Sequence, residues 1–237
     1  MRILIINCNP KLDFSSAEWF YTPFFRGLKE NGASIKKLYT TRKDLHHCKG
    51  CLNCWFTHSG QCVIKDDFAA IFEQIISADY IFLVTPLYVG NFPTKTLCLF
   101  QRMTSALNPD YSFYNGHSGH TLLRNHSIKG IGLISWCGFH EIDNFDPVIS
   151  QIKTLSYCFS VENIINIVRP HIHYFKFFPE DKIKYEKHMH TAGCQFAKNR
   201  TINTELKAEI EKDLIDTTNY FALINEYLMK KTKLHDD

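Results

Sequence analysis

The sequence of 237 residues lacks any apolar run close to the ~18 residues that a membrane-spanning helix needs. Its N-terminus has only a short apolar run and no small-residue cleavage site, so we expect no signal peptide and a cytoplasmic protein. The formal net charge is only +3, and no basic stripe alternates with aromatic residues. These absences favour a globular protein with neither a membrane nor a nucleic acid as its partner.

Cysteine, in contrast, is present nine times, an odd number in a chain without a secretion signal. We therefore expect reduced thiols that bind metal or carry redox chemistry rather than disulfides. Four of them lie close together in the sequence, at Cys48, Cys51, Cys54 and Cys62. Four thiolates on one folded loop can ligate an iron–sulfur cluster, or zinc, although the spacing is not that of two separated zinc knuckles. Alternatively, four reduced cysteines pack the loop as small apolar side chains.

Short apolar runs alternate with amphipathic segments over the first 168 residues. The alternation predicts a doubly wound α/β fold with a five-stranded parallel sheet. If the crevice lies between the first and third strands, the strand order is 2-1-3-4-5, which is flavodoxin-like. The strands are expected at residues 2–7, 34–39, 80–84, 129–136 and 161–168.

The C-terminal part of the chain predicts helices instead, at 181–200 and 204–230, the second broken near Asp216 and Thr217. Apolar residues recur about four positions apart along this second segment, so the helix needs a surface to pack on. We expect a single domain over 1–237, in which 176–237 is a helical extension that packs on the domain or on a neighbouring subunit.

The loop after the third strand suits a flat ring. Ligands of open α/β sheets bind at the carboxyl ends of the strands. Pro86 and Pro93 stiffen this loop, Gly90 lets the backbone approach closely, and Tyr88 offers an aromatic face. An ordinary strand-to-helix turn that contains a proline is the alternative interpretation.

The loop after the first strand suits an anion. Ser15 and Ser16 stand at the start of a helix, whose free N–H groups and dipole favour negative charge, and Lys11 adds a cation. Simple capping of the helix by either serine is the alternative. No G-x-G-x-x-G fingerprint is present, so a Rossmann-type NAD site is not expected.

The combined pattern resembles a known family. The runs CKGCLNCW, GQCVIKDD and ADYIFLVTPLYVGNFP, in this order, are similar to those of flavodoxin-like NAD(P)H-dependent FMN reductases, which include iron–sulfur flavoproteins. The resemblance extends from Met1 to about Val168 and implies FMN as the cofactor and NAD(P)H as a co-substrate. The phosphate loop departs from the family, because Cys8 and Phe14 stand where members usually have glycine.

The resemblance also implies where the cofactors would bind. The FMN ring would lie against the loop after the third strand, the loop at 137–139 would meet its other edge, and the phosphate would sit on the first loop. The four clustered cysteines would be candidate ligands of a 4Fe-4S cluster. The implied FMN-binding residues are Asn9, Lys11, Ser15, Ser16, Pro86, Leu87, Tyr88, Val89, Gly90, Asn91, Cys137, Gly138 and Phe139.

The resemblance finally implies an oxidoreductase that passes hydride or electrons from NAD(P)H through FMN to a quinone, a nitroaromatic, free flavin or a protein. The flavin carries the chemistry, and backbone N–H groups at 88–91 are expected to stabilise the reduced ring. The long segment at 108–127 and the apolar C-terminal helix favour a homodimer or homotetramer. Two alternatives remain: an iron–sulfur flavoprotein that serves as an electron-transfer module, and a non-enzymatic binding protein that has lost the cofactor.

Overall fold

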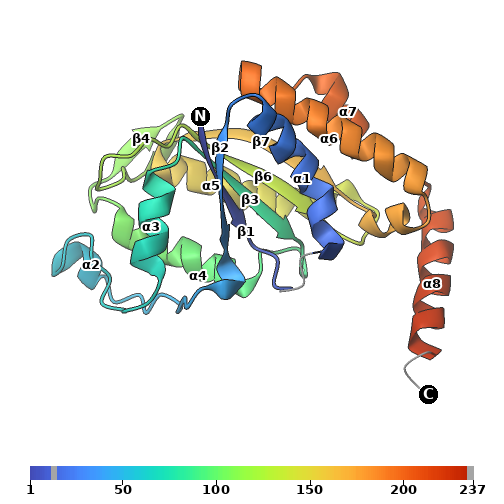
Figure 1. The fold of residues 1–237 in the computed structure, drawn as a ribbon. Helices are drawn as coiled ribbons and strands as arrows, with labels where there is room; N and C mark the ends of the chain where they lie inside the picture. The colour runs from blue at the N-terminus through green and yellow to red at the C-terminus, as the bar shows by residue number, and fades with distance from the viewer. Residues whose placement is uncertain (12–14, 234–237) are drawn as a thin grey trace.

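The computed structural model describes residues 1–11 and 15–233, with the backbone alone at 15–17 and 233. A five-stranded parallel sheet forms its centre (Figure 1), in the order β2-β1-β3-β6-β7. Numbered along the chain within this sheet, that is the predicted order 2-1-3-4-5, and the predicted fold class is confirmed. The strands are β1 (Arg2–Asn7), β2 (Ser34–Tyr39), β3 (Tyr80–Pro86), β6 (Gly130–Trp136) and β7 (Glu162–Arg169).

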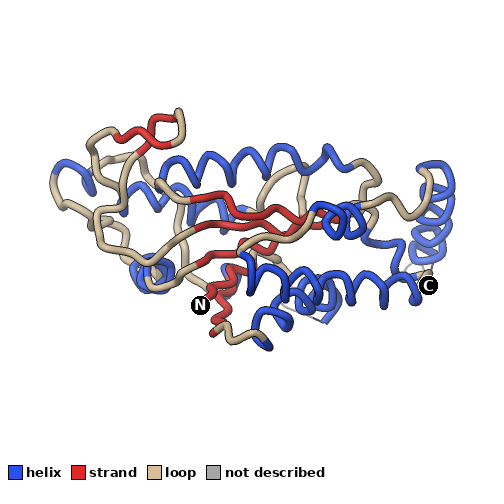
Figure 2. Tube along the Cα trace, turned by 90° about the horizontal axis from the view of Figure 1, so that it is seen from above, coloured by secondary structure: helices blue, strands red, loops and turns tan. Residues whose placement is uncertain are grey.

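Helices cover both faces of this sheet, as the view from above shows (Figure 2). Successive strand residues point to opposite faces, so Ile3 and Ile5 of β1 join one core cluster, while Leu4 and Ile6 join the other. The first cluster is covered by α1 (Ser15–Glu30), α6 (Pro179–Asn199) and α7 (Thr204–Glu211), and the second by α3 (Phe68–Ile76), α4 (Thr94–Arg102) and α5 (Asp146–Phe159).

The C-terminal helices follow the predicted pattern, including the break. After α7, the chain restarts at α8 (Thr217–Lys233), where the Asp216 carboxylate accepts a hydrogen bond from the Asn219 N–H at 3.0 Å and so caps the first turn. Helix α6 packs on the sheet through Tyr185 and Phe196, both buried. Helix α8 runs away from the sheet (Figure 1). No described helix is both long and apolar enough to cross a bilayer.

The segment at 108–127, expected as one long loop, contains a small hairpin. Its strands β4 (Ser112–Tyr114) and β5 (His117–Gly119) pair antiparallel. Asn115 and Gly116 connect them with φ of 48° and 81°, as a type I′ turn requires. The Asn-Gly pair is visible in the sequence and is the signal that identifies this hairpin. The remaining short elements are α2 (Asn53–Phe56) and the 3-10 turns η1 (Thr40–Arg42), η2 (Met103–Ala106), η3 (Ile142–Phe145) and η4 (Ile172–Lys176).

Candidate functional site

A cavity of about 430 Å³ opens at the carboxyl edge of the sheet, where β1, β3 and β6 end. Small-molecule and cofactor sites commonly have volumes of ~300–1,000 Å³, and this edge is where open α/β sheets bind ligands. All three loops named in the sequence analysis reach the cavity. The expected residues that line it are Asn9, Lys11, Pro86, Leu87, Tyr88, Cys137 and Gly138.

The other expected residues are not among the lining residues or lie outside the described part of the chain. Val89, Gly90, Asn91 and Phe139 are not among the lining residues, and Val89 is fully exposed. The Asn91 carboxamide oxygen accepts a hydrogen bond from Gln151 at 3.0 Å, so this side chain is turned towards α5. The side chains of Ser15 and Ser16 lie outside the described residues.

The reason is that the loop after β3 turns back on itself. Tyr88 and Asn91 exchange backbone hydrogen bonds of 3.2 and 3.1 Å around Val89 and Gly90, whose φ values are 51° and 68°. This is a type I′ turn with a β-branched residue in a left-handed conformation, which is uncommon. The N–H groups of Tyr88 and Asn91 are thereby used, so the expectation of backbone donors at 88–91 was wrong for these two. Among the described residues, Val89 and Gly90 keep N–H groups without a partner.

Side-chain amides build the loop after β1. The Asn7 carboxamide accepts from the Asn9 N–H at 2.9 Å, and the Asn9 carboxamide accepts from the Lys11 N–H at 3.1 Å. Both asparagines are buried. Such Asx turns hold a loop without the glycines that the family has here. Burial raises the pKa of the neighbouring Cys8 thiol to about 12, so this cysteine is neutral and packs as a small apolar residue.

Aromatic rings form a large part of the cavity wall. Trp19 and Phe20 come from α1, Trp136 ends β6, and Phe175 lies in η4. The Phe20 and Trp136 ring centroids are 5.3 Å apart, and those of Trp19 and Phe175 are 5.4 Å apart. The rings therefore support one another and present a continuous apolar surface. No pattern in the sequence marks these residues as a site, because consecutive aromatic residues on a helix are equally typical of a core.

Positive charge gathers in the same cavity. Lys11, Lys176 and Lys182 line it, and no carboxylate does so among the described residues. The Lys176 ammonium donates to the Tyr227 hydroxyl of α8 at 3.3 Å, and the Lys182 ammonium lies 4.6 Å from the Trp19 ring centroid. Burial, and then Lys176 and Lys11, lower the pKa of His173, which also lines the cavity and is therefore neutral near pH 7. The part of the cavity beside these three lysines, its basic end, thus favours an anion.

Sequence patterns did not identify the contributions of α1, of the last residue of β6 and of the segment after β7 to this site. Except for Trp136, these residues lie on helices or after β7, and only folding brings them to the ends of β1 and β3. The lining residues that it did not name are Trp19, Phe20, Trp136, Ile172, His173, Phe175, Lys176 and Lys182.

The four clustered cysteines lie on a separate loop. Cys51 is exposed, and Cys48, Cys54 and Cys62 are partly buried. The Gly50 N–H donates to the Cys48 sulfur at 3.4 Å. In the described ranges, no three of these sulfurs lie within 4.8 Å of one another, so the loop as it stands does not form a single-ion site. A multi-iron cluster spaces its thiolates more widely, and the set keeps the donor type that a cluster needs. None of the four lines the cavity.

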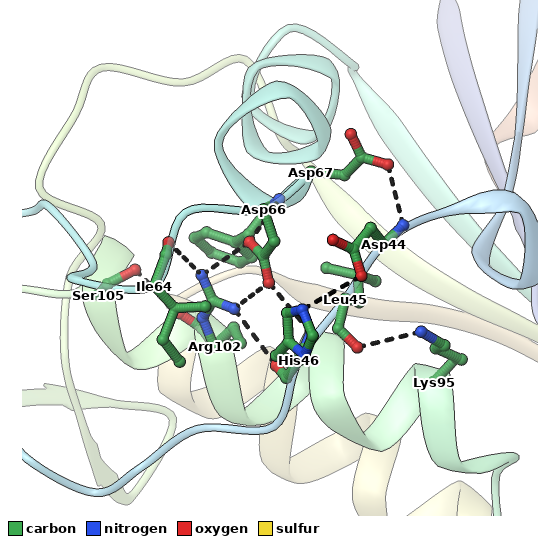
Figure 3. A network of polar contacts seen from close by, with 10 residues as sticks. Asp44, Leu45, His46, Ile64, Asp66, Asp67, Lys95, Arg102 and Ser105 are labelled. Carbon is green, nitrogen blue, oxygen red and sulfur yellow. Dashed lines mark hydrogen bonds and ion pairs between the residues drawn. The ribbon is translucent and has the colours of Figure 1, made fainter.

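The Asp66-Asp67 pair of the family pattern fixes this cysteine loop (Figure 3). The Asp66 carboxylate accepts two hydrogen bonds from the Arg102 guanidinium, at 2.5 and 3.0 Å, and one from the His46 N–H at 3.0 Å. Burial alone would raise the pKa of the Asp66 carboxyl, but Arg102 and the backbone donors outweigh it and the pKa is lowered. Asp67 accepts from the Asp44 N–H at 3.0 Å. The acidic pair at the start of α3 therefore ties down the segment leading to Cys48.

Known proteins match the N-terminal half of the chain. A family model described as NADPH-dependent FMN reductase matches residues 1–117. Residues 1–117, just under half of the chain, are therefore similar to the NADPH-dependent FMN reductase family. The resemblance stated from the sequence is thereby confirmed.

Curated relatives of the N-terminal half include two iron–sulfur flavoproteins. That of Methanocaldococcus jannaschii is 29% identical over 119 residues, which cover 50% of this chain and 59% of the relative. That of Methanosarcina thermophila is 30% identical over 87 residues, which cover 37% and 44%. The chain therefore spans about half the length of the curated relatives it matches.

Solved structures of reductases share the fold over most of their length. An NAD(P)H:quinone oxidoreductase from Methanothermobacter marburgensis has a TM-score of 0.62 at 15% identity, over 83% of this chain and 98% of the other. An FMN-dependent NADH-azoreductase from Bacillus anthracis, solved with FMN, has a TM-score of 0.60 at 19% identity, over 84% and 100%. At these identities the likeness establishes the fold alone.

Proposed function

We propose that the chain is an oxidoreductase that passes electrons from NAD(P)H through bound FMN to an acceptor. The observation that carries this proposal is the cavity at the carboxyl edge of the sheet, which has aromatic walls, three lysines and no carboxylate among its described lining residues. FMN joins a flat, largely apolar ring to a dianionic phosphate, so the two ends of the molecule match the two kinds of surface. When bound, FMN supplies the two-electron chemistry, and the protein supplies orientation and electrostatics.

The ring is assigned to the two loops that follow β3 and β6. Pro86, Leu87 and Tyr88 form one wall, and the Leu87 N–H bonds the Trp136 carbonyl at 2.9 Å, which fixes this wall to the sheet. Cys137 and Gly138 form the opposite edge. A Cβ on Gly138 would lie only 3.0 Å from His173 Nε2, so glycine keeps this edge of the cavity open. The unpaired N–H groups of Val89 and Gly90 are the candidate donors to a reduced ring.

The phosphate is assigned to the basic end. Asn9 and Lys11 come from the loop after β1, and the hydroxyls of Ser15 and Ser16 stay candidates from the sequence alone. Lys176 and Lys182 add two cations from the C-terminal half. These cations compensate for the absence of the two glycines that family members usually have at positions 8 and 14, because a phosphate can be bound by side-chain cations as well as by free backbone N–H groups.

The test is reduction of the FMN-loaded protein. Under anaerobic conditions, NADH or NADPH should bleach the visible absorbance of bound FMN, and an added quinone or azo dye should restore it. The control is free FMN at the same concentration without the protein. Bleaching no faster than in this control, with FMN bound, would overturn the proposal.

We propose that a second copy of the chain covers the mouth of the cavity. Tyr88 lines the cavity and is 47% exposed, and Val89 and Phe139, which directly follow the lining residues Tyr88 and Gly138, are 101% and 61% exposed. Apolar side chains grouped at a site entrance mark a contact surface. A homodimer or homotetramer would bury them and exclude water from the ring. Light scattering of FMN-loaded protein checks this, and a fully active monomer would contradict it.

A second candidate is an iron–sulfur flavoprotein that transfers electrons to a protein partner. It is favoured by the four cysteines on a loop tied down by Asp66, and by the names of the curated relatives. Protein purified without oxygen should then contain iron and acid-labile sulfide, and Cys54→Ser should lose them. The control Cys158→Ser removes a partly buried thiol of α5 and should keep them. Iron-free protein would exclude this candidate and leave the FMN proposal intact.

A further inference from the structure

Three metal-binding side chains meet on the outer surface where α1 crosses α6. Glu30 ends α1, and His190 and Cys194 lie four residues apart on α6, hence on one face of that helix. His190 Nε2 and the Glu30 carboxylate are 2.7 Å apart, and Cys194 Sγ and His190 Nδ1 are 4.0 Å apart. One donor atom from each of the three lies within 4.8 Å of the other two.

Two glycines cause this convergence. A Cβ on Gly193 would lie 2.0 Å from the Phe24 carbonyl oxygen, and a Cβ on Gly27 would lie 2.4 Å from the His190 carbonyl oxygen. No side chain fits at such distances, so the backbones of α1 and α6 are in contact here, on the face of the sheet that both helices cover (Figure 1). Close backbone contact brings Glu30 of one helix within reach of the short side chains of the other.

The electrostatics of the site favour a cation. The three donors are a carboxylate, an imidazole and a thiol, and no described basic side chain is hydrogen-bonded to any of them apart from His190 itself. The carbonyl end of α1 adds negative potential, and the Gly27 carbonyl lies 3.8 Å from the Cys194 sulfur. The side chains of His190 and Glu30 are 29% and 54% exposed, so an ion can enter directly from water.

We propose that Glu30, His190 and Cys194 bind a thiophilic divalent cation, with Zn²⁺ as the best match. Zinc takes thiolate, imidazole and carboxylate ligands at about 2.0–2.3 Å, which places tetrahedral neighbours about 3.5 Å apart. The three donor atoms, now within 4.8 Å of one another, would close to that spacing around the ion, and water completes the coordination. The bound ion ties α6, which carries Lys182 of the cavity, to α1. Two of the three ligands, His190 and Cys194, lie outside the residues 1–117 that match the family model. The site does not depend on FMN binding.

Cobalt titration of the full chain without oxygen tests the site, because Co²⁺ reports thiolate ligation by its absorbance. The wild type should bind one more equivalent than Cys194→Ser, and the difference spectrum should show the charge-transfer band of one thiolate. Metal bound by the cysteines at 48–62 is common to both proteins and cancels. The matched control Cys158→Ser should behave as the wild type.

A second pair of variants protects the test against misfolding. Glu30→Gln changes one exposed atom and should weaken Zn²⁺ binding by about tenfold or more, whereas Glu180→Gln, at an exposed acid at the other end of α6, should not. Zn²⁺ should also raise the Tm of the wild type by more than that of Cys194→Ser. Equal cobalt stoichiometry in the wild type and Cys194→Ser, or equal zinc affinity in both glutamate variants, would overturn the proposal.

Discussion

Removing two lysines from the cavity should weaken FMN binding and leave the ring-binding loops untouched. Lys176 and Lys182 line the cavity beside Lys11. A unit charge about 6 Å from one phosphate charge is worth ~0.7 kcal/mol at the dielectric constant of water, and a dianion doubles this to about 1.4 kcal/mol before screening by salt. With screening, we expect about 1 kcal/mol for each lysine and therefore about 30-fold weaker binding of FMN by the Lys176→Gln/Lys182→Gln double variant.

Fluorescence titration with FMN and with riboflavin isolates the phosphate contribution, because riboflavin carries the same ring without the phosphate. The double variant should lose affinity for FMN and keep that for riboflavin. Lys184→Gln is the matched control: it removes the same charge from α6, but its side chain is 70% exposed, bonded to Asp181 and outside the cavity. The loss in the double variant should shrink as salt is added.

Two results would refute this reasoning. If the double variant binds FMN within twofold of the wild type, the cations of the C-terminal half do not contact the phosphate. If riboflavin binding falls as much as FMN binding, the lysines act on the shape of the cavity rather than through charge.

Three further predictions concern stability and are checked by urea unfolding. Arg102→Met leaves a buried carboxylate unpaired and should cost about 3–5 kcal/mol, whereas Arg124→Met, at an exposed ion pair, should cost less than about 1 kcal/mol; equal losses would contradict the buried pair. Burial, and then Arg169, lower the pKa of His171 to about 3. Between pH ~6.5 and ~3 the unfolded chain therefore binds one more proton than the folded protein, so the free energy of unfolding should decrease as the pH is lowered through that window. An equally steep decrease in a His171→Gln variant would exclude this cause. Asparagine adopts a φ of 51° more readily than valine, so Val89→Asn should raise the free energy of unfolding by about 1 kcal/mol. An unchanged free energy of unfolding would show that the turn is not strained.

Sequence patterns predicted the sheet because its strands are buried on both faces. Tyr80–Pro86 and Gly130–Trp136 are wholly buried, so they are continuous apolar runs that few other structures explain. The topology then follows, since parallel strands joined by helices allow few orders. The loops after these strands were named as candidate site residues for the same reason: the carboxyl edge is set by the strands themselves.

The remainder of the cavity depends on contacts between segments distant in sequence. Lys176 and Lys182 reach the cavity because η4 and α6 fold back over α1, and their spacing shows no sign of this. Asp66 is a similar case. Its position before a helix predicts a cap, but its main partner is Arg102, 36 residues away. A single sequence shows local propensity well and shows such long-range pairs only when a known family supplies them.

The central claim is that the cavity at the ends of β1, β3 and β6 binds FMN. A crystal structure of the protein grown with FMN tests it most directly. We expect the ring between Leu87–Tyr88 and Cys137–Gly138, with the phosphate among Lys11, Lys176 and Lys182. A cavity that holds only water in the presence of excess FMN, or FMN bound elsewhere on the chain, would contradict it.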